Sequence, residues 1–196
     1  MSATNLSRAD VDHVLRRAGV AGRRAGGRGS VFSEPVLLVV KFPPTEEIFD
    51  QDGRLLAIFR AAPDNPSFLR RVLLNTQVSE LVDGRDQVLL TVRQQGPIFH
   101  TVGVDGSDAG RIWTRHGWRK SHSIEFGGEI IGSFRFAGTR RYSVLGADEV
   151  ELGRISQHRN RYKCNVIEID DAMPETLRRL MPVASKAVFD LTATKT

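Results

Sequence analysis

Cysteine is almost absent from this chain of 196 residues, because Cys164 is the one residue of that type. A single thiol cannot form an intrachain disulfide, and without a CxxC partner it cannot supply a structural zinc site. We therefore expect a reducing compartment and a buried, apolar role for Cys164. The sequence predicts no metal site and no cofactor.

Long apolar runs are also absent from the front of the chain. Polar or charged residues interrupt the segment from Ser7 through Arg17, so it lacks the roughly 7 to 15 apolar residues of a secretory signal. The run Val36–Val40 has the length of a strand and is far below the roughly 20 residues that span a bilayer. We expect a cytoplasmic protein with no integral membrane span, able to lie peripheral to the inner membrane face.

Known catalytic signatures are missing as well. The five histidines form no HExxH pattern, and the chain contains neither a GxSxG elbow nor a GxxxxGK[ST] phosphate loop. We therefore predict that the protein is not an enzyme. An enzyme that acts on a small ligand inside a barrel stays open as an alternative, because sequence order does not reveal such a site.

Positive charge is present and is concentrated at the start of the chain. The net charge is +5, and residues 1–30 carry +4 of it through six arginines and two aspartates. Within them, the pattern predicts a short helix over 7–18 with Ser7 as N-cap and an apolar face of Val11, Val14, Leu15 and Ala18. The glycines and arginines between 19 and 29 predict a flexible linker. We interpret 1–30 as a basic flexible tail and place the folded domain at 31–196.

Short apolar segments separated by Asp/Gly turns dominate the rest of the chain, which is typical of an all-β protein. Closure into a barrel would remove the exposed strand edges, so we predict a closed antiparallel barrel of about twelve strands. The expected strands are 36–42, 46–50, 54–60, 76–82, 87–93, 98–104, 109–115, 121–126, 129–136, 139–145, 150–157 and 161–169.

The pattern changes to a helical period near the C-terminus and predicts a helix over 174–191. Apolar residues recur there at intervals of three and four, Pro174 suits a first helical position, and Pro182 should kink or restart the helix. Arg178, Arg179 and Lys186 lie within it, and each charge at the centre of a bilayer would cost about 2.5 to 3.5 kcal/mol. We expect the helix to fill the barrel rather than to cross a membrane.

Four segments together resemble a known family, the phospholipid scramblase-related proteins, which share the tubby C-terminal-like barrel with the plant LURP-one-related proteins. They are FSEPVLLVV from Phe32, IFDQDGRLLAIFR from Ile48, GRISQHRNRYKCNVIEID from Gly153 and DDAMPETLRRLMPVASKAVFDL from Asp170. The resemblance covers residues 32–192. It implies a twelve-stranded barrel that encloses a hydrophobic C-terminal helix.

Some members of that family carry an acidic, calcium-associated segment before the helix, and a similar region here contains Glu168, Asp170, Asp171 and Glu175. The DxDxDG loop with a distal glutamate is absent, and these acids do not supply the six to eight oxygens that calcium takes. We interpret the acids as partners of the helix N-terminus.

Two arginine-rich stretches are the candidate anion-binding residues. The first, from Arg111 to His122, combines basic and tryptophan side chains that suit phosphate and a membrane interface. The second, from Arg154 to Lys163, is expected to face the same side as Arg140 and Arg141, as the resemblance implies for a phosphoinositide groove. A hairpin whose tryptophans pack in the core is the alternative for the first stretch. The candidates are Arg111, Trp113, Arg115, Trp118, Arg119, Lys120, Arg140, Arg141, Arg159 and Arg161.

The leading hypothesis is a non-enzymatic binding module that associates with anionic membrane phospholipid or a lipid-like ligand. The arginine-rich tail would add a salt-screened attraction to the membrane surface. The alternative is a protein-interaction or regulatory module in which the tail binds a polyanion such as nucleic acid. The sequence leaves the ligand and the oligomeric state open.

Overall fold

A computed structural model describes residues 7–19, 29–42, 45–63, 76–96, 98–115, 121–159 and 163–190. The helices are α1 (Arg8–Ala18) and α3 (Glu175–Asp190). The twelve strands within these ranges are β1 (Val36–Phe42), β2 (Thr45–Phe49), β3 (Leu55–Ala61), β4 (Thr76–Asp83), β5 (Val88–Gln95), β6 (Ile98–Gly103), β7 (Asp108–Arg115), β8 (Ser121–Phe126), β9 (Glu129–Gly138), β10 (Arg141–Gly146), β11 (Glu151–Arg159) and β12 (Lys163–Ile169).

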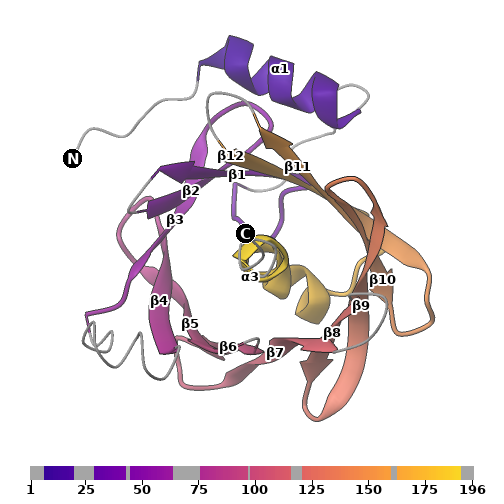
Figure 1. Ribbon diagram of the computed structural model, residues 1–196. Helices are drawn as coiled ribbons and strands as arrows, with labels where there is room; N and C mark the ends of the chain where they lie inside the picture. The colour runs from indigo at the N-terminus through magenta and orange to yellow at the C-terminus, as the bar shows by residue number, and fades with distance from the viewer. Residues whose placement is uncertain are drawn as a thin grey trace.

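The strands form an antiparallel meander in which each strand pairs with the next along the chain. β1 pairs with β2 on one side and with β12 on the other, in a register that sets Leu37 opposite Ile167. The strand order therefore runs round a closed barrel (Figure 1). The all-β class and the C-terminal helix predicted from the sequence are confirmed, and both ends of each predicted strand lie within two residues of an observed strand.

Aspartate side chains shape the turns at one end of the barrel, which explains why these turns are recognisable in the sequence. Asp50 Oδ1 accepts hydrogen bonds from the N–H groups of Asp52 at 2.8 Å and Arg54 at 2.9 Å. Asp83 Oδ1 accepts from Arg85 and Gln87 in the same way. Such Asx turns fix the backbone locally. Asp105, Asp148 and Asp170 also accept a hydrogen bond from the N–H two residues ahead.

The hydrophobic core lies inside the barrel, around α3 (Figure 1). Successive side chains of a strand point to opposite faces, so alternate apolar residues line the inner wall. The fully buried set includes Leu37, Ile112, Ile124, Phe134, Val144, Ile155 and Ile167. From the helix, Leu177, Leu180, Met181, Ala184, Ala187 and Val188 complete the core, each at most 1% exposed.

Glycines on the inner wall make room for α3. A Cβ atom at Gly132 of β9 would lie 2.6 Å from the Leu145 carbonyl oxygen and 3.3 Å from a methyl group of Leu177. A Cβ atom at Gly110 of β7 would lie 2.9 Å from a methyl group of Leu180. The close approach of the helix to the wall therefore depends on the missing side chains at these positions.

A buried ion pair joins α3 to the opposite end of the barrel wall. Lys186 Nζ lies 3.6 Å from Oε1 of Glu46 on β2, with side chains that are 9% and 13% exposed. Lys41 Nζ of β1 approaches the same carboxylate oxygen at 3.4 Å. The helix is continuous through Pro182, so it does not restart there. Within the ranges that the structure describes, no helix has both the length and the apolar character needed to cross a bilayer.

Helix α1 packs on the outside of the barrel, over β11 and β12 (Figure 1). Ser7 caps it by accepting a hydrogen bond from the N–H of Asp10, and Gly19 ends it in a left-handed conformation. The predicted apolar face is buried against the outer face of the sheet, in a cluster with Val36, Leu38, Val40, Cys164 and Val166. The helix was predicted, but its packing corrects the expectation that the folded part begins near Val31, because residues 8–18 share a core with the sheet.

The meander gives the barrel two distinct ends. The turns after β2, β4, β6, β8 and β10 lie at the end where α3 begins, which we name the α3-start end. The turn between β9 and β10 lies at the other end, where α3 finishes, which we name the α3-finish end. Figure 1 shows α3 in the middle of the ring of strands.

Candidate anion-binding site

Basic side chains from four elements lie toward the α3-finish end, where α1 packs over β11 and β12. They are Arg17 of α1, Arg140 and Arg141 at the start of β10, His158 of β11 and Lys163 at the start of β12. We name this set the basic corner. Arg141 pairs in register with Ser156, and the Gln157 N–H donates to the Arg140 carbonyl at 2.8 Å. The expectation that the second arginine-rich stretch lies beside Arg140 and Arg141 therefore agrees with the register of β10 and β11.

Three cations of the basic corner have no carboxylate partner among the residues that the structure describes. Those residues form no ion pair with Arg140, Arg141 or Lys163, and all three side chains are exposed. Elsewhere on the barrel, arginines are neutralised by neighbouring acids, as in the pairs Arg60–Glu80, Arg111–Glu125, Arg135–Glu149 and Arg154–Glu151. The basic corner therefore carries a net positive charge, whereas arginines at many other places on the barrel are neutralised by a neighbouring acid.

The pKa of His158 is affected by its burial and by the positive charges of this corner. Partial burial, together with the nearby charges of Arg141 and Arg17, lowers the pKa of the His158 imidazole. Its Nε2 atom lies 3.0 Å from the hydroxyl oxygen of Ser156 on the same face of β11. The neutral imidazole is favoured in the folded protein, so an approaching anion that offsets the arginine charges would raise the pKa of His158.

The turn that carries Arg140 has an unusual backbone for this residue type. Arg140 has a φ of 59°, in the left-handed region, directly after Gly138 with a φ of 129°. Glycine and asparagine adopt this region more readily than arginine. The Arg140 side chain is exposed at this end of the barrel.

Arg111 and Trp113, the described candidates of the first arginine-rich stretch, are not part of the basic corner. β8 and β9 separate their strand, β7, from β10. Arg111 forms an ion pair at 2.5 Å with Glu125 of the neighbouring strand β8. Trp113 is half-buried and opposite Ser123, on the outer face, which contradicts the alternative that this tryptophan packs in the central core. Trp118, Arg119 and Lys120, with the side chains of Arg115, Arg159 and Arg161, lie outside the described residues.

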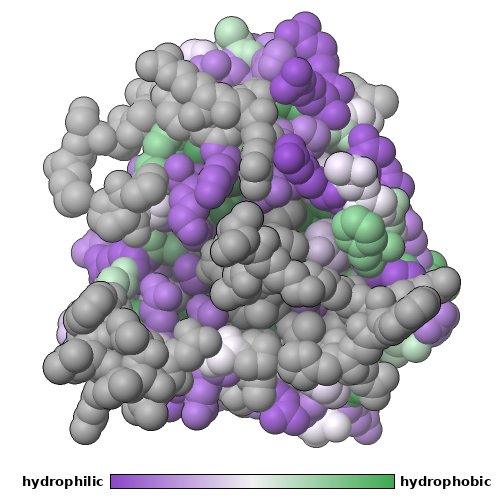
Figure 2. Space-filling model, in the orientation of Figure 1, coloured by the Kyte–Doolittle hydropathy of each residue, from purple (hydrophilic) through white to green (hydrophobic). Residues whose placement is uncertain are grey.

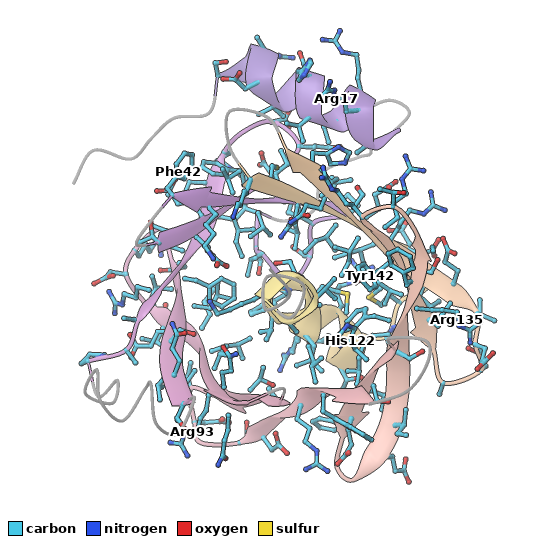
Figure 3. All side chains as sticks on the ribbon, in the orientation of Figure 1. Arg17, Phe42, Arg93, His122, Arg135 and Tyr142 are labelled. Carbon is cyan, nitrogen blue, oxygen red and sulfur yellow. The ribbon has the colours of Figure 1, made fainter. Side chains whose placement is uncertain are left out.

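Three members of the basic corner were not among the candidates from the sequence: Arg17, His158 and Lys163. Arg17 was assigned to the flexible tail, although it follows the apolar positions of an amphipathic helix. That amphipathic pattern was the available signal, because an apolar face needs a surface to cover it. Figure 2 shows hydrophilic residues gathered over α1 and the neighbouring part of the wall, and Figure 3 shows Arg17 beside that wall.

Aromatic side chains face the helix from the inner wall behind the basic corner. The ring of His122 lies 6.0 Å from that of Tyr142 and 6.4 Å from that of Phe134, between centroids. Figure 3 shows His122 and Tyr142 pointing into the barrel, whereas Arg93 and Arg135 point away from it. Burial raises the pKa of the Tyr142 hydroxyl. These groups support the wall from inside and do not reach the outer face that carries Arg141.

The acidic segment before α3 builds the start of the helix. Asp170 Oδ1 accepts a hydrogen bond from the Ala172 N–H at 2.9 Å, and Arg178 donates to the Asp170 carbonyl at 2.8 Å. Glu175 pairs with Arg179 one turn later in the helix, at 2.8 Å. In the part of the chain that is described, no three His, Cys, Asp or Glu side chains gather closely enough to hold a metal ion.

Comparison with known proteins gives a likeness in fold. No protein-family model matches the chain, and no curated protein matches it. Among solved structures, the chain is similar to the X-ray structure of a protein from Arabidopsis thaliana, with a TM-score of 0.54 and 15% sequence identity. The match covers 81% of this chain and 90% of that one. At this identity the likeness extends to the fold alone.

Proposed function

We propose that the protein is a non-enzymatic module that binds anionic headgroups of membrane phospholipid, or a lipid-like anion, through the basic corner. The observation that carries the proposal is that Arg17, Arg141 and His158 lie together on the outer face, with Arg140 and Lys163 at the same end of the barrel. Three of them have no ion-pair partner among the described residues.

The chemistry of the corner suits a phosphate group. A guanidinium presents a planar fork of donors that matches the oxygens of phosphate, and an ammonium adds a point charge. Near an anionic membrane surface each Lys or Arg contributes about 1 kcal/mol to binding. Four cations would therefore give a useful peripheral affinity without any insertion into the bilayer.

Kinship with the phospholipid scramblase-related and LURP-one-related proteins is part of the proposal. It is supported by the four segments that resemble that family and by the meander around a central C-terminal helix. The buried pair between Lys186 and Glu46 favours α3 as a core element in that fold, because a bilayer offers Lys186 no such carboxylate.

The test is co-sedimentation of the full chain with vesicles of phosphatidylserine and phosphatidylcholine, and with vesicles of phosphatidylcholine alone. The variant Arg140→Asn/Arg141→Gln/Lys163→Gln removes three charges while asparagine keeps the left-handed backbone at position 140. At about 1 kcal/mol per charge, we expect about 100-fold weaker binding to the anionic vesicles. Raising the salt from about 0.05 M to about 0.3 M should weaken wild-type binding as well.

The matched control is Arg85→Gln/Arg111→Gln/Arg135→Gln, which removes the same charge from other parts of the barrel. We expect it to retain most of the binding, because Arg111 and Arg135 are already ion-paired. Equal loss in both variants would show attraction by net charge only and would contradict the proposal. Binding of duplex DNA through these residues, without binding of the anionic vesicles, would favour the alternative of a polyanion-binding regulatory module.

A further inference from the structure

The α3-start end differs in chemistry from the basic corner. Five large apolar side chains are exposed among the described residues, and four of them lie at this end. Val104 is 63% exposed and Val150 is 53% exposed, both in turns, while Phe126 and Ile130 flank the turn between β8 and β9. The three hairpins that carry them are neighbours in the barrel. Exposed apolar side chains gathered in this way are typical of an interaction surface.

A groove opens beside these hairpins at the start of α3. A cavity of about 750 Å³ is lined by Phe32, Leu89, Val104, Ala109 and Phe126 on its apolar side and by the first turn of the helix on the other. A second cavity of about 560 Å³ adjoins it and shares Phe32, Glu175 and Arg179. The groove thus offers apolar pockets for one or two side chains next to a polar edge.

The polar edge of the groove is acidic. Asp105, Asp108, Asp171 and Glu175 line the two cavities, against Arg178 and Arg179. Both arginines already have partners, because Arg179 pairs with Glu175 and Arg178 donates to the Asp170 carbonyl. Hydrogen bonds from Ser107, and then the charge of Arg179, hold the pKa of Asp105 below its ordinary value, so this carboxylate stays ionised at neutral pH.

We propose that this groove docks a protein partner through a basic segment that carries an apolar anchor residue. The acidic edge complements lysine and arginine side chains, and the pockets beside Val104 and Phe126 accept the anchor. An anionic membrane is disfavoured at this end, because the same carboxylates would repel it. The inference does not depend on the function proposed for the basic corner, which lies at the other end of the barrel.

The probe is a phage-displayed library of random short peptides, selected on the immobilised full chain. Selected peptides are then synthesised, and their Kd is measured by fluorescence anisotropy. We expect enriched peptides in which two or more Lys or Arg residues flank a Leu, Ile or aromatic residue. Enrichment of acidic or uncharged peptides would overturn the inference.

Two variants locate the binding. Asp105→Asn/Asp108→Asn removes charge but keeps side-chain oxygens that accept from the N–H groups of Ser107 and Gly110. Val104→Ser/Phe126→Ser removes exposed apolar groups. Each should weaken a selected peptide about tenfold, which corresponds to the loss of one good contact. The controls Asp148→Asn and Phe136→Ser change an exposed acid in another turn and an exposed phenylalanine toward the other end, and should leave the Kd unchanged.

Two results would overturn this docking surface. The first is a Kd that is the same in wild type and both groove variants. The second is adsorption of the chain to phosphatidylcholine vesicles that is lost in Val104→Ser/Phe126→Ser, since the exposed apolar residues would then serve a lipid surface. Circular dichroism of each variant separates a change in binding from a loss of fold.

Discussion

Glu47 is a buried acid whose charged form is disfavoured by the loss of hydration. Its side chain is 8% exposed, and its Oε2 atom accepts no hydrogen bond from the residues that the structure describes. Burial raises the pKa of this carboxyl group above its ordinary value. The neighbouring Glu46 is on the opposite face of β2 and pairs with Lys41 and Lys186. Glu46 and Glu47 therefore have different surroundings, because successive residues of a strand face opposite sides of the sheet. Glu46 has two cationic partners, whereas Glu47 is buried with an unsatisfied oxygen.

We predict that Glu47→Gln stabilises the protein at neutral pH. The folded state binds the proton of Glu47 more tightly than the unfolded state, so its contribution to stability falls as the pH rises from the unfolded pKa through the folded pKa. The glutamine variant avoids this cost, so we expect its free energy of unfolding to be about 1 kcal/mol higher than that of the wild type at pH 7. Urea unfolding at pH 7 and at about pH 4 checks it, since the gain should shrink at the lower pH. The exposed Glu129→Gln is the control, and a less stable Glu47→Gln at pH 7 would show that the charge has a partner.

At the scale of elements, α1 is a short helix that covers one strip of the outer wall. Its four apolar residues bury the outward-facing side chains of β1 and β12, among them Cys164. Burial raises the pKa of the Cys164 thiol to about 12, so little reactive thiolate is present in the folded protein. The reactivity of the Cys164 thiol can therefore be used to measure whether α1 is packed against the sheet.

We predict that Leu15→Asp in α1 makes Cys164 reactive without unfolding the barrel. A buried charge in the small interface loosens the helix, and water then reaches the thiol, whose pKa falls toward its ordinary value. The rate of labelling with a thiol reagent at pH 8 should rise at least about tenfold. Arg16→Asp, on the exposed side of the same helix, is the control. An unchanged labelling rate in Leu15→Asp, with its circular dichroism intact, would show that the sheet protects Cys164 without help from α1.

Local chemistry accounts for what the sequence made predictable. Aspartates such as Asp50 and Asp83 hold their turns through hydrogen bonds within four residues, so strand boundaries could be inferred from adjacent residues. The sequence also led us to expect the second arginine-rich stretch beside Arg140 and Arg141, in agreement with the register of β10 and β11. The addition of Arg17 could not be inferred, because it depends on the packing of α1 against the barrel. The neutralisation of Arg111 by Glu125 was hidden for the same reason, since it depends on the register of β7 and β8.

At the scale of the whole molecule, the barrel and its central helix are held together by apolar packing and by one buried charge pair. Glu46 on β2 meets Lys186 on α3 and Lys41 on β1. The carboxylate therefore links the wall to the helix, and Lys186 also lies 6.0 Å from the centre of the Phe59 ring. The loss of Glu46 and the loss of Lys186 should therefore lower the stability by different amounts. Without Lys186, Glu46 still pairs with Lys41.

We predict that Glu46→Leu destabilises the protein more than Lys186→Met does. The first change removes the carboxylate beside a buried ammonium, at a cost of about 3 kcal/mol, whereas the second leaves Glu46 with Lys41. Urea unfolding of both single variants and of the double variant completes a cycle. The double variant should be more stable than Glu46→Leu alone. A double variant less stable than that single variant would contradict the role of the pair.

The seam between β1 and β12 has a consequence for how the chain acquires its shape during synthesis. β1 cannot form its pairing with β12 until β12 has been synthesised, because Leu37 pairs with Ile167. On the ribosome, the first strands therefore emerge long before their last partner, and α3 emerges only after it. Contacts so distant in sequence slow folding and leave unpaired edges exposed meanwhile. The newly made chain is thus most vulnerable to aggregation in the interval before the seam closes around its helix.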